Sequence, residues 1–251
     1  MDKVRFYEAC RKAEKDRPKN GIGTLSEKTV HAVMKNYFEP YADAHEQKIG
    51  PFVADIVGED GIIEIQTGSF SKLRKKLGEF LKYCRVTVVY PCAAVKHIVN
   101  YDPDSKKRIS SRRSPLKADR YTVFRELESI TDYLLHPNFR LCIMLTETDE
   151  LRCSPEKAPP GQKKKRRKNA LSVYDRIPKE LIDEIYIDSP SDWRSFLPEN
   201  IPDEFTTADL AAAGMDIGTA RLVMNVFRKA GIAEMIGKKG NAYIYKMKYC
   251  A

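Results

Sequence analysis

The sequence predicts an α/β protein with a smaller helix-and-hairpin unit at its C-terminal end. The order strand, strand, helix, strand between residues 53 and 90 implies a helix that crosses over a sheet. Two short helices followed by a lysine-tipped hairpin occupy residues 206–246. A chain of 251 residues is long enough for one large domain, or for one medium and one small domain, each with its own core.

The composition is typical of a soluble globular protein, with 42% hydrophobic and 31% charged residues. No segment approaches 18 consecutive apolar residues, and the N-terminus lacks the apolar run of a signal peptide. These observations predict a cytoplasmic protein that does not enter a membrane. Six cysteines without a C-x-x-C pair and four scattered histidines argue against a zinc site or a disulfide framework.

The positive charge is concentrated in one place. The net charge is +9, and seven of the basic residues lie between Lys157 and Lys168. Removing these seven leaves +2, so the position of the charge rather than its total suggests a polyanionic partner. The run from Lys163 to Lys168 fits a nuclear-import signal if the source is eukaryotic, and it equally fits a phosphate-binding tract. The sequence leaves both interpretations open.

Two helices are expected before the first strands. Apolar residues at helical spacing predict an amphipathic helix over residues 3–17. A second helix is expected from Thr24 to about Glu39, because Thr24 and Glu27 form a capping box. Both are expected to be scaffolding.

The next stretch, Val53–Val57 and Ile62–Gln66, reads as a hairpin across a turn bounded by Gly58 and Gly61. The turn sets a register whose opposed pairs are Val57–Ile62, Ile56–Ile63 and Asp55–Glu64. The two carboxylates would lie roughly 5 Å apart at Cβ and repel each other unless a cation lies between them.

Strand alternation places Gln66 on the face of Glu64 and turns Ile63 and Ile65 toward a core. The hairpin is therefore a candidate divalent-metal site. Upstream of it, Glu46 is either part of a solvated loop or an additional ligand of the metal or its water.

A basic helix is expected over residues 71–83. It carries Lys72, Lys75 and Lys76, and Ser69 can cap its start. Free N–H groups at a helix start bind anions, so this segment either holds a phosphate or is only a solubilising face.

Residues 85–90 predict a buried central strand that ends at Pro91. Residues 96–101 and 107–111 predict a second, basic hairpin, which either follows a phosphate backbone or is a polar flap. A helix over 121–135 and a strand over 139–145 complete the domain. The expected organisation is a main domain over 1–154, a basic linker over 155–170, a connecting segment over 171–202 and a small domain over 203–251.

The small domain resembles a winged helix. Residues 206–214 form a capped helix, a second helix runs from Asp216 or Gly218 to Gly231, and a hairpin carries Lys238 and Lys239 at its tip. In a winged helix the second helix enters a major groove while the wing contacts the DNA backbone. The candidate groove-facing residues are then Thr219, Arg221, Asn225 and Arg228. Many winged helices instead bind proteins, and that alternative stays open.

The pattern formed by Ala54-Asp55, Glu64-Ile65-Gln66, a helix and the strand Val86–Tyr90 resembles the PD-(D/E)XK nuclease superfamily. The resemblance covers about residues 24–92. It implies a restriction-endonuclease-like mixed sheet flanked by helices, a Mg²⁺ or Mn²⁺ ion, and DNA as the partner. Asp55, Glu64 and the main-chain carbonyl of Ile65 would hold the metal, and Glu46 would match an upstream acid that some members use.

Gln66 occupies the place of the usual catalytic lysine of this superfamily. A glutamine can orient a water molecule but cannot accept its proton. Lys72 is one expected substitute, and Ser69, Lys75 and Lys76 would hold a phosphate.

The expected function is a metal-dependent deoxyribonuclease that hydrolyses phosphodiester bonds and is positioned on DNA by the winged helix, either as a monomer or as a homodimer. One alternative is a non-catalytic DNA-binding protein that keeps the nuclease fold, as the Gln66 departure suggests. Another is a protein-interaction adaptor. Sequence alone does not choose the DNA substrate or the pathway.

Overall fold

The computed structural model describes residues 1–15, 29–116, 118–158 and 171–249. The expected capping box at Thr24–Glu27 and the basic run from Lys163 to Lys168 lie outside these ranges. The described chain forms two compact units, each assembled from separate segments. Unit 1 comprises residues 1–47, 91–119 and 144–184, and unit 2 comprises residues 48–90, 120–143 and 185–251.

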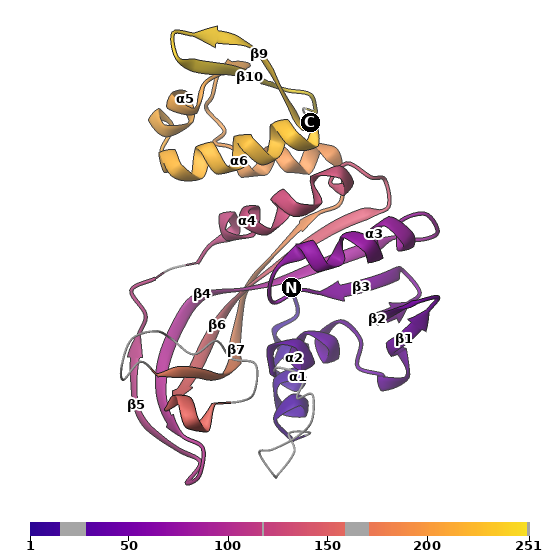
Figure 1. Ribbon diagram of the computed structural model, residues 1–251, viewed down its shortest axis with the longest axis vertical. Coiled ribbons are helices and arrows are strands. Elements are labelled where there is room, and N and C mark those ends of the chain that lie inside the picture. Colours follow the sequence, from indigo (N-terminus) through magenta and orange to yellow (C-terminus); the bar gives the residue numbers. More distant parts are fainter. Residues whose placement is uncertain (16–28, 117, 159–170, 250–251) are drawn as a thin grey trace. The chain divides into compact units, whose positions relative to one another are not determined.

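A mixed sheet confirms the α/β class. Its strands are β1 (His45–Ile49), β2 (Phe52–Gly58), β3 (Gly61–Ile65), β4 (Val86–Asp102), β5 (Lys107–Arg113), β6 (Phe139–Cys153) and β7 (Ser172–Ile187). The strand order is β1-β2-β3-β4-β6-β7, and β5 pairs with β4 (Figure 1). The pair β2–β3 is antiparallel, whereas β3–β4 is parallel. Strands β4, β6 and β7 contribute residues to both units.

Two strands are longer than expected. Strand β4 continues through Pro91 to Asp102, and β6 continues to Cys153. Proline at position 91 does not end β4, although it lacks the N–H that a ladder uses. The expected hairpin between residues 96 and 111 is therefore the second half of β4 paired with β5.

Unit 1 begins with two packed helices, α1 (Lys3–Lys15) and α2 (Thr29–Phe38). Phe6 is fully buried, and its ring packs edge-on against the ring of Tyr37, with 5.7 Å between the ring centres. Short 3₁₀ turns follow at η1 (Ala42–Ala44) and η5 (Pro155–Lys157). Helix α1 confirms the amphipathic helix expected at the N-terminus.

The prediction of a connecting segment over 171–202 is wrong for its first half, because residues 172–187 form strand β7 of the sheet. In unit 1 this strand holds the N-terminal helices. Lys3 pairs with Glu180 at 3.0 Å, and the N-terminal ammonium pairs with Glu184 at 3.1 Å. The apolar residues of β7 are interspersed irregularly with charged ones, some of which bind the N-terminal segment through ion pairs, so the usual strand alternation is missing.

In unit 2 two expected helices are divided into shorter pieces. Residues 70–80 form η2 (Phe70–Leu73) and α3 (Arg74–Phe80). Residues 120–133 form η3 (Arg120–Val123), α4 (Phe124–Leu127) and η4 (Glu128–Tyr133), and Ile130 has φ −129° and ψ 22° within the last. The apolar spacing predicts the buried face of each segment correctly, but it does not distinguish one continuous helix from several short turns that share that face.

The C-terminal part of unit 2 matches its sequence-predicted elements closely. It contains β8 (Glu204–Phe205), α5 (Thr207–Ala212), α6 (Ile217–Ala230), β9 (Ala233–Lys239) and β10 (Ala242–Met247), with the strand order β8-β10-β9. Thr206 caps α5 in a capping box with Asp209, and Asp216 caps α6. Gly231 ends α6 with φ 77°, the left-handed conformation that favours glycine.

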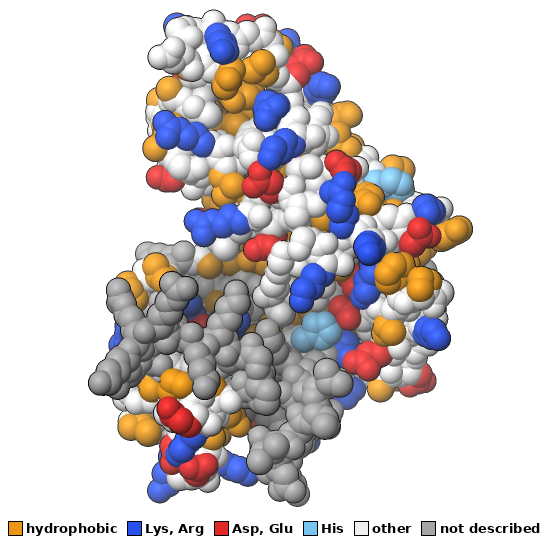
Figure 2. Space-filling model, in the orientation of Figure 1, with side chains coloured by type: hydrophobic (Ala, Val, Ile, Leu, Met, Phe, Trp, Pro, Cys, Tyr) orange, Lys and Arg blue, Asp and Glu red, His pale blue; other side chains and the backbone are white. Residues whose placement is uncertain are grey.

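Within unit 2, helix α6 lies between the β9–β10 hairpin and α4 (Figure 1). A cluster of buried aromatic rings secures this arrangement. Trp193 of η6 (Pro190–Phe196) packs against Phe227 of α6. The ring centre of Phe124 on α4 lies 4.9 Å from the ring centre of Phe196. Lys and Arg side chains are spread over the surface of α6 and the β9–β10 hairpin, with hydrophobic side chains among them (Figure 2). Among the helices described, none is long and apolar enough to cross a membrane.

Candidate functional site

The β2–β3 hairpin has the register that the sequence predicts. Ile56 pairs with Ile63, Val57 with Ile62 and Gly58 with Gly61. Gly61 has φ 115°, and a Cβ atom there would lie 2.3 Å from the backbone oxygen of Arg85. Only glycine fits this position, because both the backbone conformation and the neighbouring strand exclude a side chain.

Beyond the paired residues, the carboxylate of Asp55 reaches across to β3. Its Oδ2 atom accepts a hydrogen bond of 2.8 Å from the backbone N–H of Ile65. This bond fixes the direction of the Asp55 carboxylate and places it beside the residue that follows Glu64. The expected proximity of the two acidic residues is thus present in the hairpin.

Glu64 is fully buried, with no exposed surface. Its two carboxylate oxygens accept hydrogen bonds from the single ammonium group of Lys76, at 2.8 and 3.1 Å. Lys76 comes from α3, whose Leu77 and Phe80 are buried in unit 2. The sequence predicts that Glu64 lies on the face of β3 that points away from the core. In the structure both faces of β3 are buried, one at Ile62 and Glu64 and the other at Ile65, while Ile63 is only half-buried.

The electrostatics of Glu64 follow from this burial. Desolvation raises the pKa of Glu64 to about 7, the negative charge of Asp55 acts in the same direction, and the contact with Lys76 opposes both. The carboxyl group therefore keeps its proton to a much higher pH than an exposed glutamate does. The influence of Asp55 also shows that the two carboxyl groups are near enough to repel each other.

Two carboxylates of the hairpin are candidates for holding a divalent cation, and Lys76 already contacts both oxygens of one of them. Carboxylate oxygens are the ligands that Mg²⁺ prefers, and a cation between two repelling carboxylates would favour the ionised form of both. No cluster of three or more His, Cys, Asp or Glu side chains suited to a metal occurs in the described ranges. Asp55 and Glu64 would therefore be two side-chain ligands, with the remainder drawn from main-chain oxygen and water, which Mg²⁺ retains readily.

The structure gives Lys76 a different contact from the expected one. Lys76 was expected to hold a phosphate, but it binds Glu64. Lys72, the expected substitute for the catalytic lysine, and Lys75 are both exposed. The sequence indicates where Lys76 lies on the helix but not which group it contacts. Position 76 directly precedes the buried Leu77 and follows Leu73 by three residues, so it borders the buried stripe of the helix.

Two other sequence-predicted residues, Ser69 and Gln66, have local contacts. Ser69 caps η2, and its hydroxyl accepts a hydrogen bond from Ser71 N at 3.4 Å. Gln66 is half-buried, and its backbone N–H donates to Val89 O at 2.8 Å. Because α3 is one short helix that begins after η2, Ser69 does not open it as expected.

Glu46 belongs to unit 1, where its carboxylate pairs with Lys35 at 2.9 Å. The Lys35 side chain is only 6% exposed, so its charge needs a partner. This ion pair gives Glu46 a partner of its own, and its role as a metal ligand stays a prediction.

Of the candidate groove-facing residues, Arg221 and Arg228 on α6 are exposed. Thr219 bonds to the capping Asp216 through both its N–H and its hydroxyl. Asn225 differs from the expectation, because its amide donates to Glu128 of η4 at 3.0 Å. Helix α6 packs along η4, so the side that carries Asn225 faces protein. At the hairpin, Lys238 and Lys239 are exposed, and Lys238 Nζ lies 4.8 Å from the ring centre of Tyr243.

The fold and this site define an α/β protein with a mixed sheet and a buried, lysine-paired carboxylate on a central hairpin. The family model described as "Domain of unknown function (DUF8091)" matches residues 28–188, well over half of the chain, and the chain belongs to this family. An uncharacterised protein of Treponema pallidum (strain Nichols) is 27% identical over 226 residues, which cover 90% of this chain and 87% of the relative. No solved structure matches the chain.

Proposed function

We propose that this protein is a metal-dependent deoxyribonuclease of the PD-(D/E)XK type. The observation that carries the proposal is the group formed by Asp55, Glu64 and Lys76. Two coupled carboxylates lie on adjacent strands, and a lysine ammonium lies 2.8 Å from the buried one. The parallel pairing of β3 with β4 and the helix between them agree with the order of elements that such nucleases use.

Each residue has a task in this proposal. Asp55, directed by the Ile65 N–H, and Glu64 would hold a Mg²⁺ or Mn²⁺ ion together with the Ile65 carbonyl. The bound ion would activate the attacking water and neutralise charge on the phosphoryl group. Lys76 would take the place of the lysine that Gln66 replaces, by keeping Glu64 ionised and stabilising negative charge at the phosphate. Gln66 would orient water, because an amide can donate and accept hydrogen bonds.

The C-terminal elements support DNA as the substrate. The order β8, α5, α6, β9, β10, with β8 beside β10, agrees with a winged helix. Arg221 and Arg228 on α6, together with Lys238 and Lys239 on the hairpin, would contact the DNA. Asn225 contacts Glu128 in the second half of α6. Arg221 lies on the same face one turn nearer the start of the helix and is exposed, so it is the strongest groove candidate.

One observation favours a second candidate, a DNA-binding protein without nuclease activity. Lys76 already neutralises Glu64, and Gln66 stands where a catalytic lysine is usual. A protein that kept this ion pair as a structural element would bind DNA equally well in the presence of a chelator. It would also show no heat of Mn²⁺ binding in calorimetry.

The test is a cleavage panel with linear duplex, branched and single-stranded DNA in Mg²⁺ or Mn²⁺. Wild type is compared with Asp55→Asn, Glu64→Gln and the control Asp60→Asn, whose side chain is exposed in the hairpin turn. We expect both site variants to lose at least about a hundredfold in rate, whereas the control keeps it. The nuclease proposal fails if wild type cleaves none of these substrates, or if the two site variants cleave as fast as wild type.

A further inference from the structure

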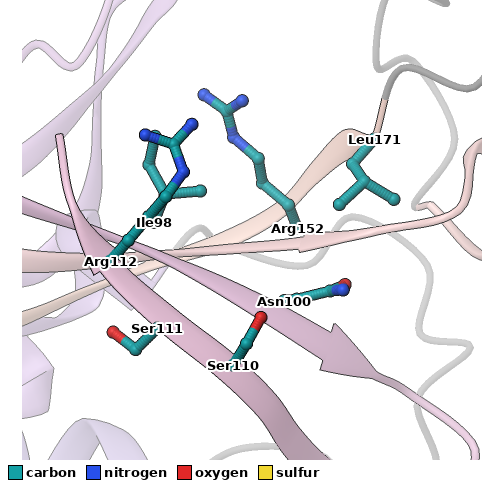
Figure 3. A pocket seen from close by; sticks show the side chains of 7 residues that line it. All are labelled: Ile98, Asn100, Ser110, Ser111, Arg112, Arg152 and Leu171. Carbon is teal, nitrogen blue, oxygen red and sulfur yellow. The ribbon is translucent and has the colours of Figure 1, made fainter.

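A polar pocket lies in unit 1, on a part of the sheet that the candidate metal site does not use. It encloses about 390 Å³ and is lined by Ile98 and Asn100 of β4, residues 110–112 of β5, Arg152 of β6 and Leu171. Figure 3 shows the guanidinium groups of Arg112 and Arg152 extending to the same side of the strands. The pocket therefore offers two arginines to one ligand.

The strand register explains why these side chains meet. Ile98 pairs with Arg112 and Asn100 pairs with Ser110. Residues directly opposite in an antiparallel pair share one face of the sheet. All seven residues of β5 are exposed, and the guanidinium of Arg112 makes no ion pair with any residue in the described ranges. Arg112 is thus presented toward solvent beside a pocket.

Positive charges outnumber negative ones around Arg152. Glu150 is buried, and three cations share it: Arg152 at 2.5 Å, Arg176 at 3.0 Å and Lys96 at 3.8 Å. Burial acts to raise the pKa of Glu150, but the hydrogen bonds from Arg152 and Arg176 outweigh it and hold the pKa below its ordinary value. One negative charge therefore stands against three positive ones, and Arg112 adds a fourth.

The chemistry of the lining selects the ligand. Guanidinium, hydroxyl and amide groups all donate hydrogen bonds, and arginine forks match the oxygens of a phosphate group. Ile98 and Leu171 add apolar surface, and the volume lies in the range of pockets that bind small molecules of nucleotide size.

We propose that this pocket binds a nucleotide unit, with its phosphate at Arg112 and Arg152 and its sugar or base against Ile98 and Leu171. The unit is either part of a nucleic-acid strand or a free nucleotide. Binding here needs no cleavage and no metal, so the inference does not rest on the proposed nuclease function.

The test compares wild type with Arg112→Ala and Arg113→Ala in the presence of a chelator. Arg113 lies opposite His97 in the strand register and on the other face of the same exposed strand from Arg112. Its replacement by alanine removes the same charge as Arg112→Ala without changing the pocket. Affinity is measured for a fluorescent single-stranded oligonucleotide by anisotropy and for deoxyadenosine monophosphate by calorimetry. We expect Arg112→Ala to weaken binding about tenfold in at least one assay, and Arg113→Ala to weaken it less than about twofold.

The two assays separate the sources of the ligand. A loss confined to the oligonucleotide identifies a strand, and a loss that includes the mononucleotide identifies a free nucleotide. Arg112→Lys is expected to bind with intermediate affinity, because lysine keeps the charge but loses the paired donors. Equal losses for the two alanine variants, no change for Arg112→Ala, or the absence of binding by wild type in both assays would overturn the proposal. Failure of the Asp55 and Glu64 variants to cleave has no bearing on it.

Discussion

The ammonium group of Lys76 lies 2.8 Å from one carboxylate oxygen of Glu64 and 3.1 Å from the other, and Glu64 has no contact with solvent. The side chain of Lys76 is partly exposed, so the lysine can be hydrated without its partner, whereas the buried carboxylate cannot. The ionisation of Glu64 therefore depends on Lys76.

The first prediction concerns stability and pH. The pKa of Glu64 rises from its ordinary 4.5 to about 7 in the folded protein, so the folded state holds more protons than the unfolded state between these values. Stability should therefore fall as pH rises from about 4.5 to about 7, by up to about 3 kcal/mol. Denaturant unfolding of the metal-free protein at a series of pH values measures this change.

The variant Glu64→Gln should lose most of this pH dependence and should be more stable than wild type at pH 8. Glu59→Gln, at an exposed position in the hairpin turn, is the control and should keep the wild-type profile. A Glu64→Gln protein whose stability still falls over the same pH range would show that the slope comes from other groups.

The second prediction concerns Lys76. Its hydrogen bonds lower the pKa of Glu64, so Lys76→Met should raise that pKa above about 7 and leave Glu64 mostly protonated at neutral pH. Binding of Mn²⁺, followed by calorimetry, should weaken at least about tenfold at pH 7 and recover at pH 9.

Lys75→Met changes the same charge at an exposed neighbouring position and should bind Mn²⁺ as wild type does. If Lys76→Met binds the metal equally well at pH 7 and pH 9, Lys76 does not control the ionisation of Glu64.

The third prediction concerns the turn between β2 and β3. Gly61→Ala would place a Cβ atom against the Arg85 backbone at a positive φ, and should cost roughly 2–4 kcal/mol of stability. Gly58→Ala meets no atom within 4 Å and should change stability by less than about 0.5 kcal/mol. Thermal and denaturant unfolding measure the loss of stability in the two variants. Equal losses would mean that the turn relaxes to accommodate the added Cβ atom.

The fourth prediction concerns helix α6. Arg221→Ala should weaken binding to duplex DNA several-fold and reduce the slope of log affinity against log salt by about 1, because one phosphate contact is lost. Arg11→Ala, an exposed arginine on α1, is the matched control. Anisotropy titrations at several salt concentrations measure both effects. If neither variant changes the slope of log affinity against log salt, α6 is not part of the DNA interface.

The sequence predicted the local elements that depend on local signals. The β2–β3 register follows from two glycines, and the bounds of α5 and α6 follow from Thr206, Asp216 and Gly231. The proximity of Asp55 and Glu64 was predictable because a hairpin register depends only on neighbouring residues. These features rest on backbone conformations and caps that few residue types support.

The partners of charged side chains were not predictable in the same way. Lys35 with Glu46, Lys76 with Glu64 and Glu128 with Asn225 each join different elements. A lysine on a helix surface looks the same in sequence whether it meets solvent or a buried carboxylate. Strand β7 was missed because its polar residues bind distant segments, so that no alternating pattern marks it.

Strand β7 also bears on how this chain folds as it is synthesised. The contacts from Lys3 to Glu180 and from Met1 to Glu184 close only when more than two thirds of the chain has been made. Contacts between residues so far apart in sequence slow folding, because a long loop must close before they form. The N-terminal segment therefore gains these contacts only after β7 has been synthesised, when unit 1 has all its segments and unit 2 still lacks its last one.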